Sequence, residues 1–304
     1  MKFGLNTGFG VEATFAGLLA AAKRYDAMGF DSLWIAHATG QDAIMAMALV
    51  GRETSRIKLG TAVVPTYTRH PLLMAQTALT AQVACNGRFI LGVGLSHKVM
   101  IEGMYGISFD KPAKHMREYL QVLAPALRNE KVAFDGELYK AHGQLTVEET
   151  ARVPLVVAAL GDRMLEIAGT YADGTITWMT GPKTLESHII PKISKAAKAA
   201  GKPAPRIVAG VPFALCPDKE AVRERLDRGL KMYGQLPSYR AMLDREGSVN
   251  PSDFTCVGDE KEIRATIRRY RDLGVTDLNC TLLGVGDREE TLQFLASEMK
   301  QMAA

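Results

Sequence analysis

The chain has 304 residues, a length that fits either two ordinary domains or one barrel of about 250 residues with insertions. Its 23% charged and 47% hydrophobic residues are typical of a globular protein and exclude a disordered, collagen-like or disulfide-scaffold chain. The net charge is +4, and because the 37 basic and 33 acidic residues are scattered, the sequence gives no support for nucleic-acid binding.

Apolar periodicity divides the chain into short apolar or β-branched runs that alternate with longer amphipathic ones. The predicted strands cover 3–7, 31–36, 57–64, 88–94, 154–160, 174–179, 206–215 and 276–283. The predicted helices cover 12–28, 41–55, 71–85, 113–129, 162–172, 184–200, 259–273 and 287–302, with a further long helical region that carries 231–247. Residues 134–147 alternate like a β-hairpin, with Asp135-Gly136 as the candidate turn.

Eight strands that alternate with helices predict the α/β class, and within it a (β/α)₈ TIM barrel with a β-hairpin insertion at about 131–150. A weak internal repeat supports this interpretation, because 25–35, 170–179 and 270–280 each run from a helix end through a glycine into a strand. An open doubly wound sheet usually has fewer strands and is the less favoured alternative. No Ser-, Gly- or Pro-rich linker divides the chain, so we expect one domain over 1–304.

The four cysteines are far apart in the sequence and form no C-x-x-C pair, so we expect them to be reduced and mostly buried. The N-terminal stretch MKFGLNTGFGVEATF has no apolar segment followed by a small-residue cleavage site, and no run approaches 18 apolar residues. We therefore expect a cytoplasmic protein with no membrane contact.

In a barrel of this kind the active-site groups follow the strands directly, because the loops converge at the carboxyl ends of the strands. This rule selects Gly8, His37, 65–70, 95–97, 161–164, 180–183 and 284–286. Three of the six histidines, His37, His70 and His97, lie at these positions.

Two of these loops have glycines at informative positions. GVGLS (92–96) lacks the third glycine of a dinucleotide-binding fingerprint, so Gly92 and Gly94 permit either close backbone packing or the approach of a ligand. In ALGDRML (159–165), Gly161 ends a strand, and the free N–H groups of the helix that follows can hold a phosphate. The alternative is that Asp162 caps this helix and that Arg163 is solvated.

Other kinds of chemistry find little support. The sequence has no H-E-x-x-H, no spaced Cys/His set and no EF-hand loop, and therefore predicts no metal site. It has no G-x-S-x-G motif, and Lys183 is only an approximate candidate for a Schiff-base lysine. Trp178-Met179 at a strand end can pack on a flat ligand or belong to the core.

Five stretches taken together are typical of one family. They are GFDSLWIA (29–36), LGTAVVPTYTRHPLLMAQTALT (59–80), GRFILGVGLSHKVMIEGMYGISFDKPAKHMREYL (87–120), VAALGDRMLEIAGTYADGTITWMTGP (157–182) and YGQLPSYRAMLDREG (233–247). Through them nearly the whole chain resembles the luciferase-like monooxygenase superfamily of flavin and deazaflavin oxidoreductases, and within it the branch that uses the deazaflavin coenzyme F420.

The resemblance implies hydride transfer at a flavin or deazaflavin ring held in the mouth of the barrel. It also implies a non-prolyl cis peptide at Ala62–Val63, behind the ring. The positions that match the cofactor-binding loops of the family are Gly94, Leu95 and Ser96 near the ring, and Leu160, Gly161, Arg163 and Met164 around the phosphate.

His37 matches a family position at which a histidine acts near the reactive ring carbon. Ala36 stands where those enzymes have Asp, and His97 replaces an acidic residue that other members have, so sugar-phosphate dehydrogenase chemistry is not favoured. Reduction of an activated double bond or carbonyl fits better, because the ring supplies hydride and one histidine supplies the proton. His37 is the first catalytic candidate and His97 the second, and Tyr239 is a further proton source to consider.

The sequence thus predicts an F420-dependent oxidoreductase that acts on a small, largely apolar substrate. The alternatives are an FMN-dependent monooxygenase of the same family, a cofactor-binding protein without turnover, and an aldolase or isomerase barrel. Homodimers are common in the family, and we expect one here. Residues 98–112 and 231–250 are expected to shape the substrate pocket, but they do not identify the substrate.

Overall fold

The structure is a computed structural model that describes residues 1–7, 14–148, 151–216, 218–284 and 287–303. Eight parallel strands form a closed barrel within the described residues, because β12 pairs with β1 and β9 pairs with β10. In order around the barrel they are β1 (Lys2–Asn6), β2 (Ser32–Ile35), β3 (Lys58–Thr61), β5 (Phe89–Gly94), β8 (Leu155–Val157), β9 (Gly174–Thr177), β10 (Arg206–Leu215) and β12 (Asp277–Leu282). The predicted (β/α)₈ class is confirmed.

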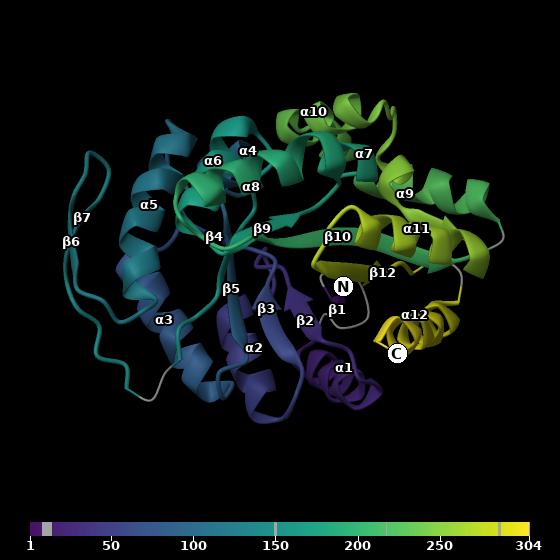
Figure 1. Ribbon diagram of the computed structural model, residues 1–304, viewed down its shortest axis with the longest axis horizontal. Helices are drawn as coiled ribbons and strands as arrows, with labels where there is room; N and C mark the ends of the chain where they lie inside the picture. The colour runs from purple at the N-terminus through teal and green to yellow at the C-terminus, as the bar shows by residue number, and fades with distance from the viewer. Residues whose placement is uncertain (8–13, 149–150, 217, 285–286, 304) are drawn as a thin grey trace.

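Helices surround the barrel (Figure 1). They are α1 (Phe15–Met28), α2 (Ala43–Arg52), α3 (Pro71–Ala84), α4 (Lys98–Gly103), α5 (Pro112–Ala126), α6 (Asp162–Tyr171), α7 (Pro182–Thr184), α8 (Ile190–Ala199), α9 (Lys219–Gln235), α10 (Pro237–Glu246), α11 (Glu260–Asp272) and α12 (Arg288–Ala303). A π-helical turn, Leu185–Ile189, joins α7 to α8, and a short 3₁₀ helix spans Pro251–Phe254. Side-chain caps fix several helix starts, among them Thr14 for α1, Asp42 for α2 and Asp259 for α11.

Three local features differ from the sequence-based expectation. The long helical region is two helices, because Leu236 precedes Pro237, takes an extended conformation and ends α9. The short helix α4 and the three-residue strand β11 (Cys256–Gly258), which pairs with the end of β10, were not predicted. Both are too short to show a clear hydrophobic period.

The predicted hairpin exists but is displaced along the chain. β6 (Val132–Asp135) pairs antiparallel with β7 (Lys140–Gly143), so four residues form the loop and Asp135 belongs to the strand. The carboxylate of Glu118 on α5 accepts the N–H groups of Glu137, Leu138 and Tyr139 at 2.7–3.3 Å. This side chain fixes the longer loop, and Figure 1 shows the hairpin outside the barrel, beyond α5. Residues 149–150 of the expected insertion lie outside the described residues.

The barrel interior is filled around Trp34, which is fully buried with Ile90, Val156, Ile176 and Val208. A Cβ atom at Gly4 or Gly60 would collide with the indole ring, so these two glycines make room for Trp34. The opposite faces of the strands contribute to the main core under the helices. Large and very small residues therefore share the interior.

At the amino ends of the strands, side-chain oxygens accept hydrogen bonds from N–H groups of the first or second strand residue. Asp31 accepts the N–H of Phe3, Gln82 that of Phe89, and Asp173 that of Leu155, at 2.7–2.8 Å. Arg206 and Asp277 form a two-bond ion pair, and the guanidinium lies 5.7 Å from the centre of the Trp34 ring. This end of the barrel is closed by paired polar groups.

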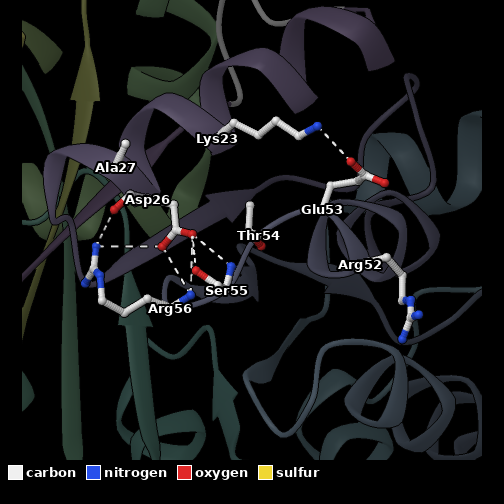
Figure 2. Close-up of a pocket in the computed structure, with 8 residues that line it drawn as sticks. All are labelled: Lys23, Asp26, Ala27, Arg52, Glu53, Thr54, Ser55 and Arg56. Atoms are coloured by element: carbon white, nitrogen blue, oxygen red, sulfur yellow. Dashed lines mark hydrogen bonds and ion pairs between the residues drawn. The ribbon is translucent and has the colours of Figure 1, made fainter.

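A hollow of about 600 Å³ lies at the same end, between the last turn of α1 and the loop before β3. Figure 2 shows the side chains that line it. The carboxylate of Asp26 accepts the N–H groups of Ser55, Arg56 and Ile57 there, and Lys23 pairs with Glu53 at 2.7 Å. Burial alone would raise the pKa of Asp26, but these hydrogen bonds outweigh it and lower the pKa. Asp26 and Lys23 therefore hold the loop before β3 against α1.

All four cysteines are free; Cys85, Cys256 and Cys280 are buried, as expected, and Cys216 is half-buried. Within the described residues, no helix combines the length and the apolar character needed to cross a membrane. The same residues contain no group of three or more His, Cys, Asp or Glu side chains able to hold a metal ion.

Candidate active site

A cavity of about 840 Å³ opens at the carboxyl ends of the strands. Its lining includes eight of the eleven residues selected from the sequence: Val63, Gly94, Leu95, Ser96, His97, Leu160, Gly161 and Met164. The remaining lining residues are Lys98, Val99, Glu102 and Phe109 from the first pocket-shaping segment, Leu236, Pro237, Ser238 and Tyr239 from the second, and Ala158. Ala62, Arg163 and His37 lie outside this lining. Gly8 and positions 285–286 lie outside the described residues.

One wall of the cavity is a bulge in the strand that contains β3 and β4 (Val64–Pro65). The Ala62–Val63 peptide is cis, which confirms that prediction. Gly60 pairs with Ile90 and Val64 with Val93, so the bulged strand has one extra residue. Ala62 packs against the interior cluster around Trp34, and Val63 faces the cavity.

Gly92 and Gly94 have different roles in this wall. A Cβ atom at Gly92 would collide with the carbonyl oxygen of Thr61, so this glycine serves backbone packing. Gly94 lines the cavity, but a Cβ atom there would meet Val63 at 2.6 Å. The sequence left two interpretations of GVGLS open, close backbone packing or the approach of a ligand. Gly92 fits the first interpretation, and Gly94 fits both.

A buried polar chain connects the hairpin to this wall. Thr66 donates its N–H to the Gly94 carbonyl oxygen at 3.0 Å and its hydroxyl to the same oxygen at 3.3 Å. Nε2 of His115 therefore donates to Thr66 Oγ1 (2.9 Å), and Nδ1 accepts from the Tyr139 hydroxyl (3.2 Å). Burial lowers the pKa of His115 to about 4, so the ring is neutral at pH 7 and can make both bonds.

The β8–α6 loop forms a second wall. The N-cap of α6 is Gly161, which offers no side-chain acceptor, so the interpretation of Asp162 as the cap is wrong. The Asp162 carboxylate instead forms an ion pair with Lys192 on α8, which lowers the pKa of Asp162. Arg163 is exposed in the first turn of α6, and no ion pair joins it to another described residue. The first N–H groups of α6 thus remain available to an anion beside the cavity.

His188, which was not selected from the sequence, fixes this loop. It lies in the π-helical turn and is 2% exposed, and its Nε2 donates to the Leu160 carbonyl oxygen at 2.7 Å. Burial lowers the pKa of His188. The two residues are 28 positions apart, and no sequence motif links them.

The two histidine candidates have different surroundings. His97 lines the cavity, and the centre of its ring lies 5.7 Å from that of Tyr239 and 6.4 Å from that of Tyr233. Burial lowers the pKa of His97.

His37 is 15% exposed at its side chain, and its backbone N–H donates to the Val63 carbonyl oxygen at 3.4 Å. Its Nδ1 accepts the N–H of Ala43 at 3.2 Å, so in the neutral ring the proton lies on Nε2. Burial lowers the pKa of His37, although Asp42, 4.0 Å away, opposes this change. His37 thus contacts the bulge through its backbone N–H and lies outside the cavity lining, while His97 faces the cavity.

The fold and the cavity define an enzyme of the (β/α)₈-barrel class, because such barrels form their active sites from the loops at the carboxyl ends of the strands. Residues 1–277 match the family model described as luciferase-like monooxygenase. The chain belongs to this family.

Similar proteins agree with that assignment. The chain is 26% identical over 309 residues to a 5,10-methylenetetrahydromethanopterin reductase of Methanolobus tindarius, covering 91% of this chain and 94% of the relative. It is 34% identical over 200 residues, 60% of this chain and 57% of the relative, to a Mycobacterium tuberculosis protein with a provisional description as a coenzyme F420-dependent oxidoreductase. The solved structure of the coenzyme F420-dependent tetrahydromethanopterin reductase of Methanopyrus kandleri shares the fold, with a TM-score of 0.83, 22% identity and 99% coverage of both chains.

Proposed function

We propose that this protein is an oxidoreductase that transfers a hydride between coenzyme F420 and a small, largely apolar substrate with an activated double bond or carbonyl. The observation that carries the proposal is the 840 Å³ cavity, which has apolar walls, one neutral histidine and an adjoining uncapped helix N-terminus. A volume of this size falls within the range of cofactor pockets. The relatives described as F420-dependent support the choice of coenzyme.

The residues present fit such a coenzyme. The space beside Gly161 is open, since no atom of the described residues lies within 4 Å of a Cβ atom placed there. The N–H groups of the first α6 turn, together with the Arg163 guanidinium, would hold the phosphate, with Leu160 and Met164 flanking it. Ala62 and Val63 would support the ring from behind, and Gly94, Leu95 and Ser96 would border it. When bound, the deazaflavin supplies two-electron hydride chemistry.

The protein supplies the proton and the environment. Because burial lowers the pKa of both His37 and His97, each ring is mainly neutral at pH 7 and offers an N–H donor. His97 lies in the cavity and can hold or protonate a substrate oxygen there. His37 can act on the ring side through its Nε2–H, with its orientation fixed by the Ala43 N–H bond.

A side-by-side titration of the apo-protein with F420 and FMN tests this proposal. We expect tighter binding of F420, followed by anaerobic turnover of reduced F420 with a carbonyl or enone acceptor. Oxygen consumption with reduced FMN would instead support the FMN-dependent monooxygenase that the family description suggests. Tight F420 binding without reoxidation by any acceptor would indicate a non-catalytic cofactor-binding protein. No binding of either ring would leave the aldolase or isomerase alternative.

We also propose that 1–304 forms one domain and that the protein is a homodimer. Met45 and Leu49 lie one turn apart on α2, and Leu73 lies on the neighbouring α3; all three side chains are exposed. A second copy would cover this apolar face. Sedimentation of the wild type and of a Met45→Glu/Leu49→Glu variant tests it, and a monomeric wild type would contradict it.

A further inference from the structure

A second, smaller cavity of about 230 Å³ lies at the same end of the barrel, between α9 and the ends of β9, β10 and β12. Its lining is mostly apolar and consists of Trp178, Pro212, Arg225, Leu226, Gly229, Leu230, Thr281, Leu283 and Gly284. It shares no lining residue with the larger cavity. The two are neighbours, because Tyr239 of the larger cavity packs against the same apolar cluster as Leu226 and Leu230.

One polar side chain lines this cavity from the barrel itself. Thr281, on β12, is 1% exposed, and its hydroxyl oxygen has no hydrogen-bond partner among the described residues. The side-chain oxygen of Asn279, two residues earlier on the same face of β12, is also buried and unpartnered. Buried polar atoms are normally satisfied, so the unpartnered hydroxyl of a residue that lines a cavity is a candidate contact for a ligand.

The charge in the lining comes from Arg225 on α9. Arg225 is exposed, and within the described part of the chain no carboxylate forms an ion pair with it. Arg223 and Arg228, on the same helix, also have no ion pair within the described residues, but of these three arginines Arg225 is the one that lines the cavity. Arg225 can therefore receive an anionic group at the rim of an apolar cavity.

We infer that the smaller cavity is a second binding site, separate from the larger one, and that it takes a small oxo acid: an apolar body inside, a carbonyl oxygen at the Thr281 hydroxyl and a carboxylate at Arg225. The volume, roughly that of eight water molecules, limits the ligand to a small molecule. The hydroxyl can donate to a carbonyl oxygen or accept from a hydroxyl group, so it suits a ligand with either group at this point.

Three probes distinguish the proposed contact at Thr281 from the proposed contact at Arg225. 4-Oxo-4-phenylbutanoate has both polar groups, its amide lacks the charge, and 4-phenylbutanoate lacks the ketone. Binding of each is measured by ligand-observed NMR at low salt. In the wild type we expect the oxo acid to bind more tightly than either analogue, by roughly fivefold in each case. The preference over the amide should shrink as salt is raised.

Variants assign each preference to its residue. Arg225→Gln should remove the preference for acid over amide, and Thr281→Val should remove the preference for ketone over methylene. Gly229→Leu should weaken binding of all three probes about tenfold or more, because nothing lies within 4 Å of a Cβ atom at Gly229 and the new side chain can enter the cavity. Arg228→Gln, an exposed neighbour on α9 outside the lining, is the matched control and should behave like the wild type.

The affinity for F420 is measured on every variant and should not change. Probes that bind the wild type equally, fail to bind, or remain bound in Gly229→Leu would overturn the inference. If F420 binds while the probes do not, the proposed function stands without this pocket. If the probes bind as expected while neither F420 binding nor turnover occurs, the cavity is a small-acid site and the proposed function is wrong.

Discussion

The two ends of the barrel differ in how their polar groups are satisfied. At the amino ends, Asp31, Gln82 and Asp173 accept N–H groups of the first or second strand residue, and Arg206 pairs with the nearly buried Asp277. Toward the carboxyl ends, the hydroxyl of Thr281 has no hydrogen-bond partner among the described residues, and α6 begins without a side-chain cap. One end thus stabilises the fold, and the other retains binding capacity for a ligand.

The strongest test of this comparison is Asp277→Asn. Its carboxylate side chain is 3% exposed and that of Arg206 is 18% exposed, so the substitution leaves a largely buried cation without its partner. We expect the free energy of unfolding to fall by about 3 kcal/mol, measured by urea denaturation. F420 affinity should be unchanged where the variant is folded.

The double variant Arg206→Met/Asp277→Leu is the control, because removal of both charges avoids an unpaired one and should restore most of the stability. If Asp277→Asn is as stable as the wild type, the ion pair at the amino ends of the strands does not stabilise the fold.

At the other end, His97→Asn should reduce single-turnover reduction of an acceptor about 100-fold, while F420 affinity stays within about threefold. Because burial lowers the pKa of His97, a wild-type rate that depends on its protonated form should rise as pH falls, with a midpoint below 6.5. The variant should lose this dependence. His37→Asn, measured in parallel, tests the ring-side candidate, and parent rates in both variants would exclude both histidines.

Arg163→Glu should weaken F420 binding by about 2 kcal/mol, because an attractive contact with the phosphate becomes repulsive. The ring-only fragment, which lacks the phosphate, should bind as before. Arg117→Glu on α5, an exposed charge reversal away from the cavity lining, should change neither affinity. Equal losses of both ligands in Arg163→Glu would indicate an effect on folding rather than on the phosphate.

The smallest expected effect is that of Asp26→Asn, which should reduce stability by about 1 kcal/mol at pH 7 through weaker acceptance of the loop N–H groups. The pKa of Asp26 is lowered in the folded state, so its contribution is present above the unfolded pKa of about 4 and is lost as pH falls through the folded value. The difference in stability between wild type and variant should therefore shrink below pH 4. A constant difference down to pH 2 would contradict this account.

The amino-acid sequence by itself determined the barrel, because the period of the apolar residues and the glycines at helix ends are local signals. The same local reasoning placed Gly94 to His97 and Leu160 to Met164 after strands, and the barrel brings all of them except Asp162 and Arg163 into the lining of one cavity. It did not foresee the β11 strand or the exact hairpin loop, since the first is three residues long and the second depends on Glu118, at least 19 positions away.

Only the tertiary structure decided which candidate site residues contact one another or line the same cavity. His97 meets Tyr239 in the cavity, although 142 residues separate them (239 − 97), whereas His37 turns its Nδ1 to Ala43. His188 reaches the Leu160 carbonyl oxygen, and Thr281 and Arg225 line one small cavity from a strand and a helix. Such meetings depend on barrel closure and side-chain packing, which couple distant positions and leave no periodic or spaced signal in the sequence.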